Sequence, residues 1–226
     1  MPMFDTQRVA TLTGRGNGAT MATVLASGLA MRLCHDLSGP LVAVLSALEM
    51  AAEEAPPAEP DAPLAVAGAC ARHLAARLAL LRAAWGMDTG TLDATRIGDL
   101  AEGLPNRGRI SLDLGGMGNG TLDGLTGRIV LNMLLLAAAG LPKGGTIALG
   151  WEGRGFMARI QGPKVIWPEG LAGMLADPEA SEPSPHNALP VLLGRLVLQG
   201  GLRVGVVPPT GAAGTVSAAL RLSDAT

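Results

Sequence analysis

The sequence contains no tyrosine, two phenylalanines and three tryptophans in 226 residues. Proteins that hold single-stranded nucleic acid stack its bases on aromatic side chains, and this chain has too few for such a platform. The formal net charge is -2, and the 17 lysines and arginines form no cluster along the sequence. Nucleic acid is therefore not expected as a partner.

Cysteine and long apolar runs are also scarce. The two cysteines, Cys34 and Cys70, fit neither a disulfide framework nor a metal-binding spacing. The longest apolar run, residues 129–141, is interrupted by Asn132 and is shorter than the ~20 residues of a membrane-spanning helix. The N-terminus lacks the apolar core of a signal peptide. These features predict a cytoplasmic protein with reduced cysteines, no bound metal and no membrane segment.

Hydrophobic residues are abundant, at 48%, which is enough to build one large or two small domains. Residues 1–19 show no periodicity and are predicted to form a mobile arm. From residue 20 to residue 52, apolar residues recur at steps of four and three, which predicts an α-helix with one buried face. This stripe consists of Leu25, Leu29, Leu33, Leu37, Leu41, Val44 and Leu48.

A second helix is predicted from Ala62 to Trp85, after a proline-rich loop. Its apolar residues alternate at steps of three and four, as in a coiled-coil seam. They are Leu64, Ala67, Ala71, Leu74, Leu78, Leu81 and Trp85. Two such helices cover only part of each other's apolar faces. A second copy of the chain would complete a four-helix bundle, which predicts a homodimer. Alternatively, the rest of the same chain covers the exposed side.

The pattern changes at about residue 92 to short strands and helices. Strands are predicted at residues 109–114, 146–151, 156–160, 202–207 and 215–222, and helices at residues 96–104, 122–139, 169–176 and 188–199. Strands in one layer and helices in the other form an α/β sandwich. The predicted class is therefore α+β, with a helical hairpin at residues 20–88 followed by a sandwich domain at residues 89–226.

The first predicted helix contains a histidine followed directly by an acidic residue, His35 and Asp36. His35 lies midway between Leu33 and Leu37, so at about 100° per residue it points away from the apolar stripe. An exposed imidazole is a good nucleophile near neutral pH and suits phosphoryl transfer. Asp36 would either orient one ring nitrogen or act as the base that takes up a proton.

The surroundings of His35 predict an open docking surface. The neighbours one turn away are Met31, Arg32, Ser38 and Gly39, and the same side continues with Val42, Ala43 and Ser46. Arg32 is expected to offset phosphate charge. Pro40 removes a backbone donor and is expected to kink the helix. The other histidines, His73 and His186, have no partners at metal-ligand spacing and are predicted to be surface residues.

Two segments carry a resemblance to sensor histidine kinases. LCHDLSGPLVAVLSALEM, residues 33–50, resembles their phosphorylation box, with its histidine, acidic residue, leucine and later proline. GRIVLNMLLLAAAGLPKGGTIAL, residues 127–149, resembles a helix and strand of their ATP-binding domain, and places Asn132 where magnesium is held. No DxGxG loop is present, and Gln161 and Gly162 stand near where its aspartate and glycine are expected. ATP is therefore not expected to bind.

A histidine-bearing hairpin joined to such a degenerate domain resembles the ChpT-type histidine phosphotransferases of alphaproteobacterial phosphorelays. The resemblance implies that the receiver domain of a hybrid histidine kinase phosphorylates His35, which then passes the group to the aspartate of a response regulator. It also implies a homodimer with no tightly bound cofactor, in which the receiver supplies Mg²⁺. Two rivals stay open, namely an active ATP-dependent histidine kinase and a non-catalytic dimeric scaffold or inhibitor of a two-component system.

Overall fold

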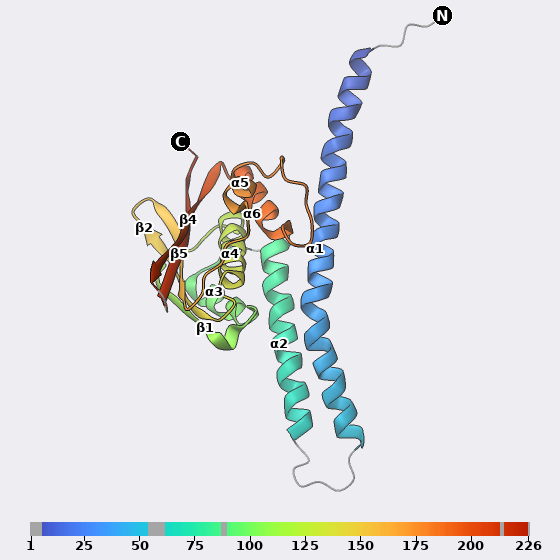
Figure 1. Cartoon of the computed structure of the whole chain (residues 1–226), viewed down its shortest axis with the longest axis vertical. Helices are drawn as coiled ribbons and strands as arrows, with labels where there is room; N and C mark the ends of the chain where they lie inside the picture. The colour runs from blue at the N-terminus through green and yellow to red at the C-terminus, as the bar shows by residue number, and fades with distance from the viewer. Residues whose placement is uncertain (1–5, 54–61, 87–89, 213–214, 226) are drawn as a thin grey trace, which may run out of the picture.

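The computed structural model describes residues 6–53, 62–86, 90–212 and 215–225. Two long helices, α1 (Thr6–Glu53) and α2 (Ala62–Trp85), lie side by side as an antiparallel hairpin (Figure 1). A domain of helices and strands packs against one side of this hairpin. The end of the hairpin near residues 53 and 62 projects beyond that domain (Figure 1).

Helix α1 begins much earlier than the sequence predicted. The expected irregular arm is wrong for residues 6–19, which are helical, whereas residues 1–5 lie outside the described residues. Three glycines in this stretch each disfavour a helix by about 1 kcal/mol. They do not end it, because α1 contains no proline before Pro40 and adding residues to an existing helix costs far less than starting one.

The apolar stripe of α1 is covered along only part of its length, contrary to the prediction of a buried face. Leu25 is buried in a small cluster with Met174, Ala188 and Val191 of the C-terminal domain. Further along, Leu41 is 48% exposed and Leu48 is 45% exposed. The C-terminal domain thus covers one end of the stripe, and within the described residues of one chain the other end faces solvent.

Five strands form one sheet within the described residues, in the order β1-β2-β3-β5-β4. They are β1 (Ile110–Gly116), β2 (Gly145–Glu152), β3 (Gly155–Gly162), β4 (Leu202–Ala212) and β5 (Thr215–Asp224). β1 and β2 are parallel, and the remaining neighbours are antiparallel. All the predicted strands are present, so the α+β class with a sandwich domain is confirmed.

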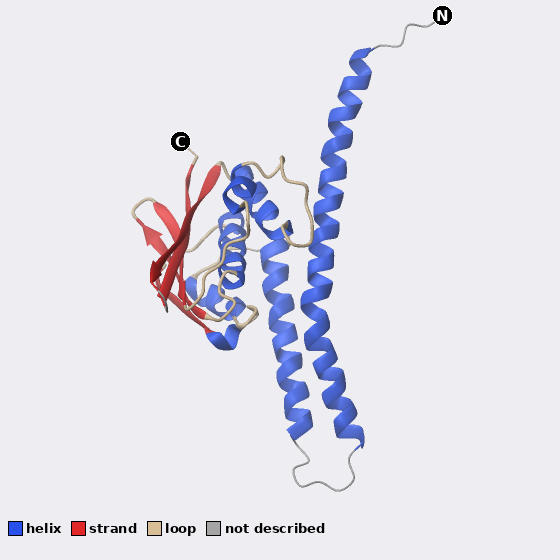
Figure 2. Cartoon of the chain, in the orientation of Figure 1, coloured by secondary structure: helices blue, strands red, loops and turns tan. Residues whose placement is uncertain are grey.

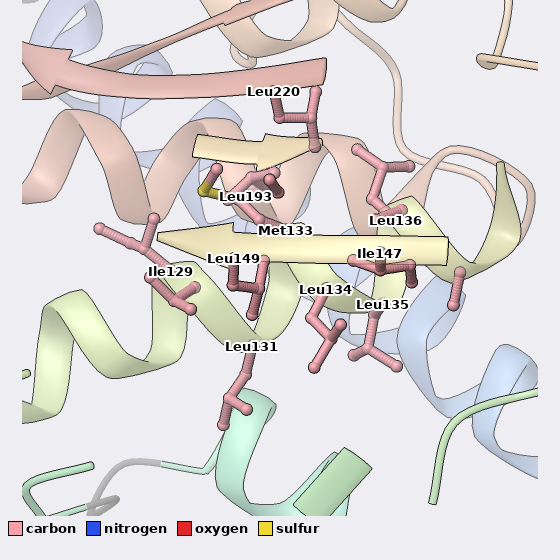
Figure 3. Packing of buried hydrophobic residues seen from close by; sticks show 14 of the residues in the cluster. Ile129, Leu131, Met133, Leu134, Leu135, Leu136, Ile147, Leu149, Leu193 and Leu220 are labelled. Carbon is pink, nitrogen blue, oxygen red and sulfur yellow. The ribbon is translucent and has the colours of Figure 1, made fainter. Parts of the chain in front are cut away.

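Helices lie between the sheet and the hairpin (Figure 2). They are α3 (Ala94–Ala101), α4 (Gly124–Ala139), α5 (Leu171–Ala176) and α6 (Ala188–Gln199), with a short 3-10 turn, η1 (Arg107–Arg109), before β1. Helix α4 occupies the centre, and residues 129–138 are all buried. In Figure 3, Leu131, Leu134 and Leu135 extend from one side of α4, as their spacing along the helix requires, and Ile147 and Leu149 lie on the neighbouring strand β2.

Local sequence sets the ends of these elements. Asp93 and Asp123 cap α3 and α4, with their carboxylates accepting from the backbone N–H of Arg96 and Thr126. The tight turn into β2 requires glycine at residue 144, where φ is +80° and a Cβ would lie 2.3 Å from the carbonyl oxygen of Arg109. These signals explain why most helices and strands in residues 92–225 begin and end within a few residues of the predicted positions.

Two helical segments, Met21–Ala51 and Pro63–Trp85, are long and apolar enough to span a membrane by length and composition. The sequence prediction of no membrane-spanning segment considered only uninterrupted apolar runs. These two helices qualify because their mean hydropathy over 18 residues is high, although polar residues interrupt them. Core helices of a water-soluble bundle pass the same test. Both helices here contribute charged side chains, Asp36 and Arg77, to a partly buried ion pair.

Candidate functional site

His35 stands on α1 with 90% of its side chain exposed. Leu33 and Leu37, two residues before and after it, are half-buried. The imidazole therefore faces solvent, on the side that the helical spacing predicted. An exposed ring of this kind is accessible to a partner protein.

Asp36 lies between the imidazole and two guanidinium groups. Its Oδ1 is 3.5 Å from Nδ1 of His35, at the outer limit of a hydrogen bond. Its Oδ2 accepts from Arg77 and lies 4.0 Å from Nε of Arg32. With the carboxylate beside Nδ1, the other ring nitrogen, Nε2, is left without this neighbour.

Arg77 is the residue that sequence reasoning missed. It lies on α2, is 5% exposed, and donates both to Asp36 and to the carbonyl oxygen of Gly103, the latter at 3.2 Å. Gly103 follows α3 and packs so tightly that a Cβ there would lie 2.3 Å from the carbonyl oxygen of Ala76. Arg77 thus joins both hairpin helices to the C-terminal domain. The available signal was a single arginine on the apolar side of the second predicted helix.

Arg32 lies one turn before His35 and is partly buried. Burial lowers the pKa of its guanidinium, the Asp36 carboxylate opposes this change, and the nearby Arg77 adds to it. An arginine pKa is high enough that the group stays charged at neutral pH. Two guanidinium groups beside one carboxylate leave an excess of one positive charge next to His35, which favours an approaching anion.

A hollow of about 430 Å³ opens beside the imidazole. Its lining combines residues of α1 with two residues of the loop before α6. These are Met31, Arg32, His35, Asp36, Pro185 and His186. The sequence predicted the α1 residues as neighbours, but not the contribution of the loop. Its volume lies in the ~300–1,000 Å³ range of small-molecule sites.

The remaining predicted docking residues lie along exposed parts of α1. Ser38, Gly39, Val42, Ala43 and Ser46 are all exposed. The helix continues through Pro40, whose missing N–H leaves the carbonyl of Asp36 without its usual helical donor. Ser38 donates to the carbonyl oxygen of Cys34 at 2.7 Å, so its side chain folds back onto the helix.

The three residues predicted for a degenerate nucleotide site do not converge. Asn132 is fully buried, at 0% exposed. Its Nδ2 donates to the carbonyl oxygen of Ala84 at 2.9 Å and to that of Arg128 at 2.8 Å. Its Oδ1 accepts from Nε1 of Trp85 at 3.1 Å. Asn132 therefore ties α4 to the end of α2. The resemblance placed Asn132 in a degenerate nucleotide site, and in this structure both atoms of its amide make hydrogen bonds within the chain.

Gln161 and Gly162 lie elsewhere. Gln161 is exposed on β3, on the opposite side of the strand from the buried Ile160 that faces the helices. Gly162 is buried against Gly144, whose carbonyl oxygen would lie 2.6 Å from an added Cβ. Gln161 and Gly162 therefore lie on the sheet, whereas Asn132 lies in the joint between α2 and α4.

Comparison with solved structures finds a bacterial phosphotransferase with a TM-score of 0.68 and 22% sequence identity, a match that covers 87% of this chain and 95% of that one. The Acinetobacter baumannii histidine kinase AdeS has a TM-score of 0.39 and 12% identity, over 85% of this chain and 98% of that one. The mycobacterial sensor histidine kinase MprB has a TM-score of 0.36 and 22% identity, over 59% of this chain and 97% of that one. The first match shows a shared fold, and the other two are too distant to add to it.

No curated protein matches the sequence. Residues 95–210 match the family model described as the histidine phosphotransferase C-terminal domain. That match covers more than half of the chain and includes all of β1 to β3 and the helices α4 to α6. The chain therefore belongs to the histidine phosphotransferase family.

Proposed function

We propose that this protein is a phosphorelay intermediate. In this proposal His35 accepts a phosphoryl group from the receiver-domain aspartate of a hybrid histidine kinase and passes it to the aspartate of a response regulator. The observation that carries the proposal is the exposed imidazole of His35, with Asp36 beside Nδ1 and Nε2 open to a partner. Membership of the histidine phosphotransferase family supports the same chemistry.

The transfer needs only a nucleophile, an orienting group and positive charge. Nε2 of His35 attacks the phosphorus, the P–O bond to the receiver aspartate breaks, and the carboxylate leaves with the electron pair. The proton on Nδ1 stays in place, and the positive charge of the phosphorylated ring lies next to Asp36. We therefore assign Asp36 the role of orienter, and transfer to the regulator is the same step in reverse.

Magnesium supplied by the receiver would neutralise charge on the phosphoryl oxygens. This chain contributes Arg32 on its own side of the group, one turn from the nucleophile. Among the described residues, no cluster of three or more His, Cys, Asp or Glu side chains is placed to hold a metal ion.

ATP is not the proposed phosphoryl donor. Asn132 is used as a joint between α2 and α4, and Gln161 replaces the carboxylate expected at an adenine site. A neutral amide oxygen accepts a weaker hydrogen bond from the adenine amino group than a carboxylate does. The protein is therefore proposed to lack autokinase activity and to depend on a phosphorylated partner.

The receiver is proposed to dock on the exposed side of α1. Small residues around His35 let a partner backbone approach closely, and the exposed side chains of Met31 and Val42 offer apolar contact. The positive charge of Arg32 complements the acidic site of a receiver. Such partners are cytoplasmic, so the protein is proposed to act in the cytoplasm without binding a membrane or nucleic acid.

A homodimer is proposed from the uncovered end of the hairpin. Leu41, Leu45 and Leu48 of α1 form one exposed stripe, and Leu64 and Leu78 of α2 are exposed as well. A second hairpin packed on these residues would complete a four-helix bundle. The C-terminal domain of the same chain covers only the other end, through α3, α4 and α6.

The central test supplies a receiver domain carrying a radioactive phosphoryl group. The expected result is acid-labile, alkali-stable label on the wild-type protein, none on His35→Ala, and normal labelling of His73→Ala, which changes an exposed histidine of α2. Labelled ATP with Mg²⁺ alone is expected to give no label. Autophosphorylation from ATP would favour a kinase. Absence of label on the wild-type protein, with His35→Ala still binding the kinase or receiver, would favour a non-catalytic scaffold.

A further inference from the structure

The hollow beside His35 has two walls that come from different domains. One wall is the side of α1 that carries Arg32, His35 and Asp36. The other is formed by Pro185 and His186, in the loop between α5 and α6. A second imidazole therefore faces the phosphoacceptor across this space, more than a hundred residues away along the chain.

The loop that carries His186 is held by its own hydrogen bonds. The Oδ1 of Asn187 accepts from the backbone N–H of Ser184 at 2.6 Å and from its hydroxyl at 3.1 Å. The Nδ2 of Asn187 donates to the carbonyl oxygen of Glu182 at 3.0 Å. Pro183 within this turn is buried. The backbone on both sides of His186 is thus fixed by side chains that do not themselves line the hollow.

This loop is also packed directly against α1. At Gly28, two turns before His35, an added Cβ would lie 3.3 Å from the backbone of Ser184 and 3.4 Å from Cβ of Ala188. Leu25 packs with Ala188 in the same contact. The position of His186 relative to the phosphoacceptor is therefore set by a close helix contact.

The chemistry of the hollow suits a phosphoryl group. Among the described residues, the exposed ring of His186 makes no hydrogen bond, so it is available to a ligand. A histidine ring donates at least one N–H in either tautomer, and both nitrogens donate when it is protonated. With Arg32 on the α1 wall, donors stand on both sides of the space into which a group on His35 would extend.

We propose that His186 is a phosphate-binding residue of this site, which donates to an oxygen of the phosphoryl group as it moves to and from His35. This inference rests on the proposed function of His35. It makes the site a product of both domains, with the nucleophile on the hairpin and one donor from the sandwich domain. Donors that meet developing charge lower the barrier most when they are fixed in advance.

The test compares two phosphoryl donors of different size. Phosphoramidate transfers its phosphoryl group to an imidazole without a partner protein: its P–N bond breaks, ammonia leaves with the electron pair, and Nε2 of His35 forms the new P–N bond. The second donor is a phosphorylated receiver domain. We expect His186→Ala to slow labelling of His35 about tenfold with both donors. His186→Gln, whose amide also donates, restores part of the rate, and His73→Ala leaves it unchanged.

The outcomes separate this inference from the proposed function. Normal labelling of His186→Ala by both donors overturns the inference and leaves the role of His35 intact. A defect with the receiver alone also overturns it, because His186 then contacts the partner protein and not the phosphoryl group. Wild-type protein that gains no label on His35 from either donor overturns both. A thermal melt of His186→Ala that matches wild type confirms that the exposed substitution leaves the fold unchanged.

Discussion

Arg77 is the residue on which the geometry of the site most depends. It is buried, and its guanidinium satisfies a carboxylate on α1 and a carbonyl oxygen in the C-terminal domain. Removing it leaves Asp36 without its principal partner and the buried carbonyl of Gly103 unpaired. Loss of one partner of a buried ion pair is much more costly than loss of an exposed one.

We expect Arg77→Met to lower the free energy of unfolding by about 3 kcal/mol. The same change is expected to slow phosphoryl transfer to His35, because Asp36 then no longer has a fixed position beside Nδ1. Chemical denaturation measures the first effect and labelling by a phosphorylated receiver measures the second.

Arg72→Met is the matched control, since Arg72 is an exposed arginine on the same helix. It is expected to change stability by less than about 0.5 kcal/mol. If Arg77→Met and Arg72→Met unfold at the same denaturant concentration, the proposed importance of the Arg77 link is wrong.

The sequence predicted one part of this site and missed the other for a physical reason. The side on which His35 lies follows from helical periodicity, a local property that can be counted along the chain. Arg77 meets Asp36 across 41 residues, and His186 reaches the hollow from much further away. Such pairs depend on how the elements pack, and no local pattern encodes that packing.

Among the individual elements, α4 begins at a cap with a pH dependence that can be measured. The carboxylate of Asp123 accepts from the backbone N–H of Thr126 at 2.8 Å and from its hydroxyl at 3.0 Å. The backbone hydrogen bond from Thr126 is the main cause that lowers the pKa of Asp123 below its ordinary value of 3.8. The ionised form is therefore favoured in the folded protein.

We expect Asp123→Ala to cost about 1 kcal/mol of stability at neutral pH. A depressed pKa contributes stability above the ordinary value of 3.8, and this contribution is lost as pH falls through the lower value of the folded state. The difference between wild type and Asp123→Ala should therefore shrink below about pH 4. Thermal or urea unfolding across this pH range measures it.

Asp123→Asn is the control, because an asparagine oxygen caps a helix without titrating. Its stability relative to Asp123→Ala is expected to stay constant across the same pH range. If the stability difference between wild type and Asp123→Ala stays the same at low pH, the claim that the ionised carboxylate of Asp123 stabilises this helix end is wrong.

Most elements were predictable because each shows a periodicity of its own, and the two main errors involve proline and glycine. β4 extends to Ala212, although the prediction stopped at Val207, before Pro208 and Pro209. Prolines cannot donate to a sheet, but β4 is an edge strand and its register shifts between Val207 and Thr210. The glycines near the start of α1 caused the other error. They disfavour a helix locally, but this preference is outweighed because the helix that follows extends through them.

For the whole molecule, the main question is what covers the free end of the hairpin. Leu45 and Leu48, in the last turns of α1, are both exposed. We expect the double variant Leu45→Glu with Leu48→Glu to raise the dimer dissociation constant at least about a hundredfold, because unpaired carboxylates in an apolar bundle oppose association. Sedimentation equilibrium measures the change in mass.

Leu198→Glu serves as the control, since Leu198 is an exposed leucine of α6 in the C-terminal domain. It is expected to leave the dimer intact. Wild-type protein that sediments as a monomer at micromolar concentration, or a double variant that remains dimeric, would rule out this end of the hairpin as the interface.

The amide of Asn132 limits any attempt to convert this architecture into an ATP-driven enzyme. Grafting an acidic adenine-binding loop would be insufficient, because the side chain that the resembling kinases use for magnesium here fastens Trp85 and the end of α2 to α4. Releasing it for a metal ion would loosen the attachment of the sandwich domain to the helices that carry His35. In this chain a working nucleotide pocket and a rigid two-domain scaffold are therefore alternatives, and redesign toward one would weaken the other.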